Sequence, residues 1–265
     1  SNVFAQKQEG YFGVYVRILN GNISSNTSRS LIEQLDGYVA NDVRVSINQG
    51  LMLRFVPEAN IPYIYEVLKA HDLASPGANS IANITACPGT DTCNLAISDS
   101  TNITSKLEAV ISEDFPDLIY NNDIKIKISG CMNSCGQHSL ASIGFHGSTL
   151  KVGNKILPAL QVLIGGGPTG DGGGVIAEKV IKVPSKRVKQ VIATILDDYN
   201  DKKSDGEYFH SYATRQEPMY FYNLLKYNEL PFFPATGEDG RSGPGELGGL
   251  FGRVELELQV TSKNE

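Results

Sequence analysis

The chain contains four cysteines, and they form two close pairs: Cys87 and Cys93, with five residues between them, and Cys131 and Cys135, with three. Small, turn-forming residues surround both pairs, which lets backbone amides approach the sulfur atoms closely. Four thiolates that converge on one place are a ligand set for an iron–sulfur cluster or for a zinc ion. The cysteines are therefore the residues best suited to carry chemistry in this sequence.

Zinc and disulfide bonds are the competing interpretations of the four cysteines. Structural zinc sites usually take ligand pairs about two to four residues apart, so the longer first pair counts against zinc, although the second pair fits. Two disulfides would need an oxidising compartment, and the first residues lack the charged and apolar segments of a secretory signal. Neither alternative accounts for the abundance of Gly, Pro, Ser, Thr and Asn around the cysteines.

The segments around the cysteines resemble the sirohaem and 4Fe-4S region of the assimilatory nitrite and sulfite reductases. The similarity lies in residue type, spacing and order, over Ala86-Cys87-Pro88-Gly89, Cys93-Asn94-Leu95-Ala96, Gly130-Cys131-Met132-Asn133-Ser134-Cys135-Gly136-Gln137 and Ile143-Gly144-Phe145. The chain departs from the family at Met132, where proline is common, but it keeps every ligand. Methionine is the more flexible residue, so this loop has less conformational restriction than the family pattern.

The resemblance implies both a cofactor site and an activity. It implies that Cys87, Cys93, Cys131 and Cys135 hold a 4Fe-4S cluster, that Cys135 also bridges to the iron of a sirohaem, and that Asn133 lies in the cofactor pocket. The implied enzyme is an oxidoreductase that takes nitrite to ammonia or sulfite to sulfide with six electrons. The implied electron donor is a ferredoxin or a flavoprotein. The alternative is an iron–sulfur electron-transfer or scaffold protein that holds the cluster without sirohaem.

The catalytic residues stay unassigned at this point. In the family, the basic residues that bind the anionic substrate come mainly from an N-terminal half of the polypeptide. Near the cysteines, Lys125 and Lys127 alternate with isoleucines. This alternation favours a strand with its isoleucines in the core and its lysines in water.

The sequence before the cysteines predicts a ferredoxin-like half-domain, which we place at residues 1–77. Its order of strand, helix, strand, strand, helix is most of a βαββαβ unit. The apolar spacing predicts strands at 11–18, 43–47 and 51–56 and helices at 30–40 and about 62–70.

The sequence around and after the cysteines predicts a mixed α/β domain at residues 78–200, which would bind the sirohaem and the 4Fe-4S cluster. The fold class of the whole chain is therefore α+β. The predicted elements are helices at 103–115 and 185–199 and strands at 124–128, 140–145 and 158–164. The glycine-rich run 165–174 is either a plain turn or a turn close to the flat cofactor, and His138 is either a titrating group near the cofactor or a hydrogen-bonded neighbour of the site.

Residues 201–265 form a predicted C-terminal extension that is rich in aromatic residues and glycine. The segment 208–233 is too apolar for a free tail, so we expect it to pack on this chain or on a partner. After the glycine-rich segment 237–252, residues 254–260 alternate like a half-exposed strand that could extend the edge of a sheet.

Composition limits the partners of the chain. With 265 residues and 41% hydrophobic content, it can bury a proper core. A net charge of −6 without a basic run argues against nucleic acid and acidic membranes, and no apolar stretch reaches the about 18 to 20 residues of a membrane helix. We expect a soluble, cytoplasmic protein. The family carries this arrangement twice and we find it once, so we expect a C-terminal part whose partner is the missing N-terminal half or a second subunit, with a naturally compact enzyme as the alternative.

Overall fold

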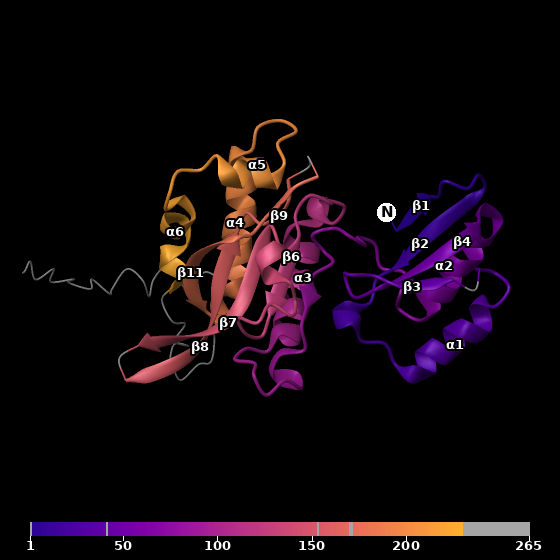
Figure 1. The fold of residues 1–265 in the computed structure, drawn as a ribbon, viewed down its shortest axis with the longest axis horizontal. Helices are drawn as coiled ribbons and strands as arrows, with labels where there is room; N and C mark the ends of the chain where they lie inside the picture. Colours follow the sequence, from indigo (N-terminus) through magenta and orange to yellow (C-terminus); the bar gives the residue numbers. More distant parts are fainter. Residues whose placement is uncertain (1, 41, 153, 170–171, 230–265) are drawn as a thin grey trace, which may run out of the picture. The chain divides into compact units, whose positions relative to one another are not determined.

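Two β-sheets, each with a hydrophobic core of its own, organise the computed structural model (Figure 1). It describes residues 2–40, 42–152, 154–169 and 172–229. The glycine-rich and alternating segments predicted at 237–252 and 254–260 lie outside the described residues, as does the end of the aromatic segment.

The first sheet has four strands in the order β1-β2-β4-β3, and all neighbours are antiparallel. Its strands are β1 (Val3–Ala5), β2 (Tyr11–Val16), β3 (Val43–Val45) and β4 (Leu51–Pro57), and its helices are α1 (Ser25–Leu35) and α2 (Ile61–Ala70). From β2 to α2 the chain follows the predicted order of strand, helix, strand, strand, helix. The N-terminal β1 lies beside β2, in the place where a βαββαβ unit would have its last strand.

The apolar spacing of α1 and α2 packs both helices against this sheet. Ile64, Val67 and Leu68 of α2 are buried, as their spacing predicts. Helix α1 starts earlier than the predicted 30–40, because the Ser24 side chain accepts a hydrogen bond from the Thr27 N–H and caps it there. It ends at Leu35, so Val39 lies beyond the helix and that part of the prediction was wrong.

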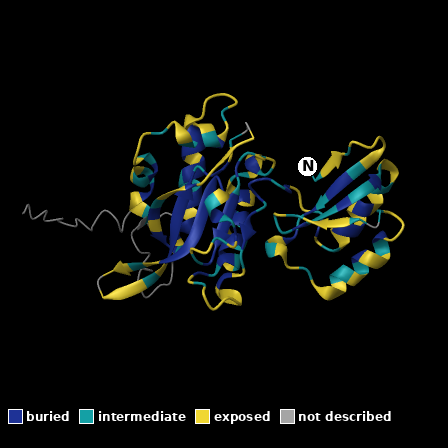
Figure 2. Ribbon diagram, viewed as in Figure 1, coloured by how far each residue is buried: buried dark blue, intermediate teal, exposed yellow. Residues whose placement is uncertain are grey.

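The second sheet has five strands in the order β11-β8-β7-β6-β5. They are β5 (Thr85–Ala86), β6 (Ile126–Ser129), β7 (Ile143–Val152), β8 (Lys155–Ile164) and β11 (Glu178–Pro184), together with helices α3 (Ser100–Asp114) and α4 (Val188–Lys202). Strands β5, β6 and β7 are parallel, while β8 is antiparallel to β7 and β11. Strands β5 to β8 are buried along most of their length, and the exposed end of the β7–β8 hairpin projects beyond the sheet (Figure 2).

The two faces of the second sheet differ in chemistry. Ile126 and Ile128 of β6 point with Phe145 of β7 into the apolar core formed with α3 and α4. The opposite face carries Lys127, which is only 8% exposed. The prediction that Lys127 points into water was therefore wrong, because Gln137, which follows β6, folds back over this face and accepts a hydrogen bond from the lysine. Lys125 is half-buried, and its ammonium group donates to the Asn122 carbonyl at 2.7 Å.

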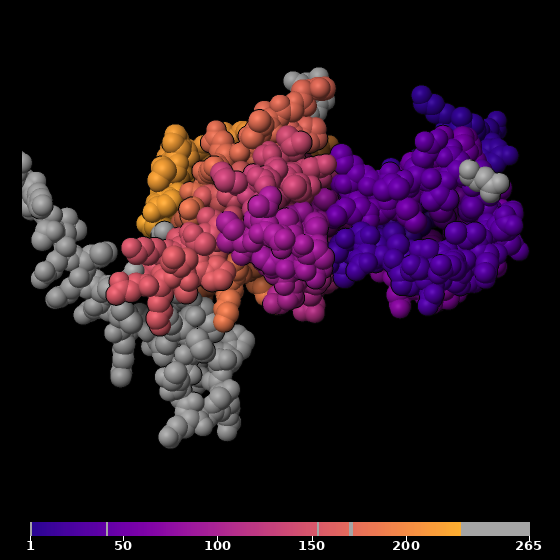
Figure 3. Space-filling model, turned by 60° about the horizontal axis from the view of Figure 1, so that its bottom comes forward, coloured from indigo at the N-terminus to yellow at the C-terminus, as the bar shows by residue number. Residues whose placement is uncertain are grey.

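The chain after α4 continues on the same core. Helices α5 (Phe209–Thr214) and α6 (Tyr220–Leu225) bury Phe209, Tyr212 and Leu225 completely. Figure 3 shows the orange and yellow surface of these residues against the coral surface of the strands. The aromatic segment thus packs on this chain, which was one of the two predicted possibilities.

The glycine-rich run includes two short strands, β9 (Gly167–Pro168) and β10 (Gly174–Val175), which pair with each other. Among the described residues, no helix combines the length and the apolar character needed to span a membrane.

Candidate metal centre

The topology of the second sheet brings the two cysteine pairs to one edge. Cys87 follows β5 directly, and Cys131 stands two residues after the end of β6. Because β5 and β6 are parallel neighbours, their carboxyl ends meet at the same edge of the sheet, where open α/β sheets bind their ligands. The Cys87 N–H donates to the Ile128 carbonyl at 3.1 Å, which continues the pairing into the first cysteine loop.

Glycines let the two cysteine loops touch. A Cβ at Gly130 would lie 2.7 Å from the Cα of Gly89, and a Cβ at Gly136 would overlap the Ile128 carbonyl. The amides of Ile97 and Ser98 both donate to the Gly130 carbonyl, at 2.7 and 3.1 Å. Any larger residue at Gly130 or Gly136 would push the loops apart, so these glycines set the spacing of the two cysteine pairs.

The sulfur of Cys87 has a backbone donor that stabilises a thiolate. The Gly130 N–H donates to it at 3.0 Å, while the nearby Ser100 hydroxyl donates to the Cys87 carbonyl at 2.6 Å. Ser100 is the first residue of α3, so the positive end of the helix dipole also lies beside this sulfur. Hydrogen bonds and helix dipoles of this kind lower the energy of an anionic thiolate and of an iron–sulfur cluster.

The four cysteines are all free thiols, and they differ in exposure. Cys87 and Cys131 are half-buried, whereas Cys93 and Cys135 are exposed. Within the described part of the chain, no three His, Cys, Asp or Glu side chains are grouped as they are around a single metal ion. A 4Fe-4S cluster takes one thiolate at each of its four irons, so its sulfur ligands surround a cluster rather than a single ion.

A buried polar group lies under the second cysteine loop, on the polar face of the sheet. The Ser129 hydroxyl accepts a hydrogen bond from the Gly136 N–H at 3.0 Å and lies 2.8 Å from His138 Nδ1. The rings of His138 and His146 are in contact at a tilt of 47°, with their centroids 4.8 Å apart. Lys127 Nζ donates to the Gln137 side-chain oxygen at 2.9 Å. The chain segment that carries Cys135 is therefore tied back to β6.

The two histidines are held in their neutral forms. Burial, and then the neighbouring charges of His146 and Lys179, lower the pKa of His138 to about 4. Burial also lowers the pKa of His146, against an opposing effect of its hydrogen bond with the Gly147 carbonyl and with further lowering from Lys179 and Lys182. His138 is only 4% exposed and hydrogen-bonded, which favours the interpretation of a satisfied neighbour of the site.

Exposed apolar side chains lie close to the cysteines along the chain. Leu95 and Met132, which lie next to or near Cys93 and Cys131 in sequence, are 70% and 69% exposed. Ile97 and Leu140 are also exposed. Large aliphatic side chains in water beside a ligand loop fit a flat, apolar group that would cover them.

Asn133 and the buried polar residues of the site differ in how well the sequence predicted them. Asn133 is exposed within the second cysteine loop, and its side chain has no hydrogen bond among those found in the described residues. Sequence reasoning missed Ser129 and His146 as parts of the site, and it placed Lys127 in water. Their grouping depends on the register of β6 and β7, which pairs Ser129 with His146, and no local pattern reveals that register.

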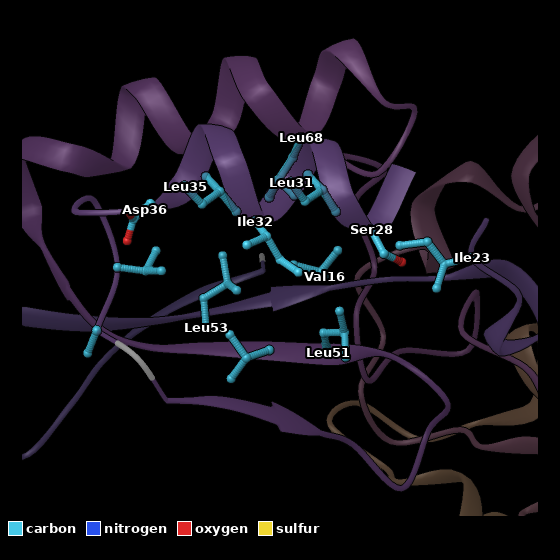
Figure 4. A pocket seen from close by; sticks show the side chains of 13 residues that line it. Val16, Ile23, Ser28, Leu31, Ile32, Leu35, Asp36, Leu51, Leu53 and Leu68 are labelled. Carbon is cyan, nitrogen blue, oxygen red and sulfur yellow. The ribbon is translucent and has the colours of Figure 1, made fainter. Parts of the chain in front are cut away.

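A separate apolar cavity of about 460 Å³ lies between α1 and the first sheet (Figure 4). Aliphatic side chains such as Leu31, Leu35 and Leu53 point into it, and Ser28 and Asp36 are its polar lining. No cysteine or histidine lines this cavity, so it lacks the ligands and proton carriers of the cysteine loops.

Comparison with protein families assigns both parts of the chain. Residues 77–215 match the family described as the nitrite and sulphite reductase 4Fe-4S domain. Residues 4–71 match the nitrite/sulfite reductase ferredoxin-like half domain. The first match includes all four cysteines and covers the polar face that lies under the second cysteine loop.

Individual curated relatives of the chain are nitrite and sulfite reductases. The chain is 23% identical over 216 residues to the assimilatory ferredoxin-dependent nitrite reductase of Haloferax mediterranei, covering 80% of this chain and 36% of that protein. It is 26% identical over 213 residues to sulfite reductase [ferredoxin] 1 of Mycolicibacterium paratuberculosis, covering 79% and 38%. The chain thus spans little more than a third of the length of these two relatives.

A solved structure has the same fold. The NirA protein of Mycobacterium tuberculosis superposes with a TM-score of 0.71 at 24% identity, covering 82% of this chain and 40% of that one. The likeness supports the α+β fold with a ferredoxin-like half-domain and a 4Fe-4S domain. From the two family matches, the chain belongs to the nitrite and sulfite reductase family.

Proposed function

We propose that the chain is the cluster- and sirohaem-bearing part of a six-electron reductase that takes nitrite to ammonia or sulfite to sulfide. The observation that carries the proposal is the packing of the two cysteine loops at the carboxyl ends of β5 and β6, with the Gly130 N–H on the Cys87 sulfur. In this proposal Cys87, Cys93, Cys131 and Cys135 are the four cluster ligands.

The donor set and its surroundings fit a 4Fe-4S cluster. Four thiols from two loops supply one ligand for each iron, and the glycines hold the loops in contact. The Gly130 N–H and the first turn of α3 supply positive partial charge beside Cys87, which offsets the negative charge of a thiolate-bound cluster.

The exposed side of the same loops fits sirohaem. Cys135 is exposed and free to reach a second iron, and Asn133 is exposed in the same loop. Leu95, Met132 and Leu140 would cover the apolar surface of a flat macrocycle. When bound, the coupled sirohaem and cluster would supply electrons one at a time to the anion, while the protein places, orients and protonates it.

The names of the relatives support the proposed class of substrate and the proposed electron donor. One relative is a nitrite reductase and another a sulfite reductase, and both are named as ferredoxin-dependent. We infer that the substrate is one of these two anions and that the donor is a ferredoxin, with a flavoprotein as the alternative. The basic residues that neutralise the anion would come from an N-terminal half of the polypeptide or from a second subunit.

The test is a visible absorption spectrum of protein purified without oxygen, together with its iron and acid-labile sulfide. We expect sirohaem bands and about five irons per chain, four in the cluster and one in the haem. A Cys131→Ala variant should lose the cluster, while Met132→Leu, which changes a neighbouring non-ligand side chain, should keep it. Four irons without sirohaem bands would favour an electron carrier, and a colourless protein that binds zinc would refute the proposal.

A further inference from the structure

Strand β5, which leads into Cys87, has a second neighbour that is not a strand. β5 contains only Thr85 and Ala86 and pairs with β6 on one side. On its other side lies Gln49, from the turn between β3 and β4 of the first sheet. Gln49 Nε2 donates to the Ala86 carbonyl at 2.7 Å, and the Ala86 N–H donates to Gln49 Oε1 at 2.8 Å. One side-chain amide thus makes both hydrogen bonds that a neighbouring strand would make.

The backbone holds Gln49 ready for this contact. Its φ of 63° is in the left-handed region, which is unusual for a residue other than glycine. Two glycines pack tightly around it: a Cβ at Gly50, the next residue, would lie 2.5 Å from the Val16 carbonyl, and one at Gly21 would lie 3.0 Å from Gln49 Cβ. A strained conformation persists only where its surroundings fix it, so the turn presents the amide to β5 in a defined orientation.

The contact matters because Ala86 is buried. With Gln49 in place it is 1% exposed, and an apolar side chain at position 49 would leave its N–H and C=O without the partners they have now. The next residue is Cys87, whose own N–H donates to Ile128 on the other side. The peptide that carries the first cysteine is therefore fixed on both of its edges.

We propose that Gln49 is a positioning residue for the cluster, which sets the place of the Cys87 sulfur by completing the edge of β5. The inference rests on the proposed function only in taking Cys87 as a cluster ligand. It gives the ferredoxin-like half a direct influence on the cluster, through one side chain that lies 37 residues before Ala86.

The test compares two substitutions at Gln49 with one at the residue beside it. Gln49→Met keeps the length of the side chain and removes both hydrogen bonds, and Gln49→Glu keeps the acceptor for the Ala86 N–H. The matched control is Asn48→Ala, which removes a different contact between the same two regions, the 2.6 Å hydrogen bond from Asn48 Nδ2 to Asn79 Oδ1. Each is measured in the full chain by amide hydrogen exchange around Ala86, by the EPR spectrum of the reduced cluster, and by the rate of iron loss to a chelator.

In Gln49→Met we expect the hydrogen-exchange rate of the Ala86 amide and the rate of iron loss both to rise at least about tenfold over the unsubstituted chain. The EPR spectrum of the reduced cluster should also change. Gln49→Glu should retain part of the protection, and Asn48→Ala should behave like the unsubstituted chain. Unchanged spectra and rates in Gln49→Met would overturn the proposal, as would equal effects in Asn48→Ala. If the unsubstituted chain holds no cluster, the proposed function fails, and exchange at Ala86 still decides whether Gln49 fixes this strand.

Discussion

Ser129 shows how one small side chain organises the second cysteine loop. It is the last residue of β6, is 1% exposed, and joins the Gly136 N–H and the His138 ring through one hydroxyl. Without that hydroxyl, two buried polar groups next to Cys135 would have to find other partners. Polar groups of this kind are costly to leave unpaired.

Replacing Ser129 by alanine should lower the free energy of unfolding by about 1–3 kcal/mol, because it leaves the Gly136 N–H and His138 Nδ1 without their partner. Urea unfolding would measure the change. Ser112→Ala is the matched control, since its hydroxyl donates only to the Glu108 carbonyl within α3. A loss in Ser129→Ala no larger than that of Ser112→Ala would contradict the prediction.

The lowered pKa of His138 predicts a dependence of stability on pH. The pKa is 6.5 in the reference state and about 4 in the folded chain, so between these values the unfolded state binds more protons. The stabilisation is complete above about pH 6.5 and is lost as the pH falls toward 4, by at most about 3 kcal/mol. Urea unfolding at a series of pH values should show this slope, and His138→Gln should flatten it. An equal slope in the variant would assign the effect to other groups.

The sequence identified the cysteines but not the groups that surround them. The motif predicts Cys87, Cys93, Cys131, Cys135 and Asn133 as site residues, and these assignments stay predictions. Gly130, Ser100 and Gln49 act on Cys87 through backbone approach and side-chain geometry, which depend on the packing of loops far apart in sequence. Lys127 is buried because residues after β6 cover it, so its alternation with isoleucine is misleading.

At the scale of elements, Asp198 joins three helices. Its carboxylate accepts hydrogen bonds from Lys202 at 2.6 Å within α4, from the Tyr212 hydroxyl of α5, and from the Tyr220 hydroxyl of α6 at 2.7 Å. Burial raises the pKa of Asp198, but the hydrogen bonds from Lys202, Tyr212 and Tyr220 outweigh it and lower the pKa overall. The ionised carboxylate therefore holds α5 and α6 on α4.

Asp198→Asn should weaken this junction, because an amide is a poorer acceptor for three donors than a carboxylate is. We expect a loss of about 2–3 kcal/mol and faster hydrogen exchange in residues 203–229, with little change in β6 and β7. Asp197→Asn, at the exposed neighbouring position, is the control. The effect should also fade as the pH falls through the folded pKa of Asp198, since protonation removes the charge in the unsubstituted chain. Uniform exchange changes across the second sheet would count against a local role.

Long, periodic elements were predictable, and short ones were not. The spacing of Ile64, Val67 and Leu68 predicted α2, and the apolar pattern of 103–115 predicted most of α3. Strands β1 and β5 have three and two residues, over which no periodicity can develop. Strand β11 was missed because a bulge between Lys179 and Ile181 interrupts its alternation. The predicted boundaries at 77 and 200 stay a prediction.

For the molecule as a whole, side chains join its two hydrophobic cores. Arg17, the residue directly after β2, forms an ion pair with Glu108 of α3, and both side chains are nearly buried, at 14% and 10% exposure. The same carboxylate accepts from the Ile84 N–H at 3.1 Å, while Arg17 Nη1 donates to the Pro76 carbonyl at 3.2 Å. The pair thus links the ferredoxin-like half both to α3 and to the segment that leads into Cys87.

Removing Arg17 alone should destabilise the chain more than removing the charge from both partners. Arg17→Leu leaves a buried carboxylate without its cation, which costs about 3–5 kcal/mol in comparable pairs. Burial already raises the pKa of Glu108 against the opposing effect of Arg17, so without Arg17 the pKa should rise further. A carboxyl whose folded pKa is raised loses stability as the pH rises, so the cost of Arg17→Leu should be larger at pH 7 than at pH 5.

Glu108→Gln in the Arg17→Leu background separates loss of charge balance from loss of contact. Glutamine keeps an acceptor for the Ile84 N–H and has no charge, so the double variant should recover most of the stability and lose the added dependence on pH. A double-mutant cycle by urea unfolding at pH 5 and pH 7 would measure both effects. If the two substitutions were additive at both pH values, the ion pair would not couple the cores. The two sheets would then be held together by hydrogen bonds such as that between Asn48 and Asn79, whose loss should be insensitive to pH over this range.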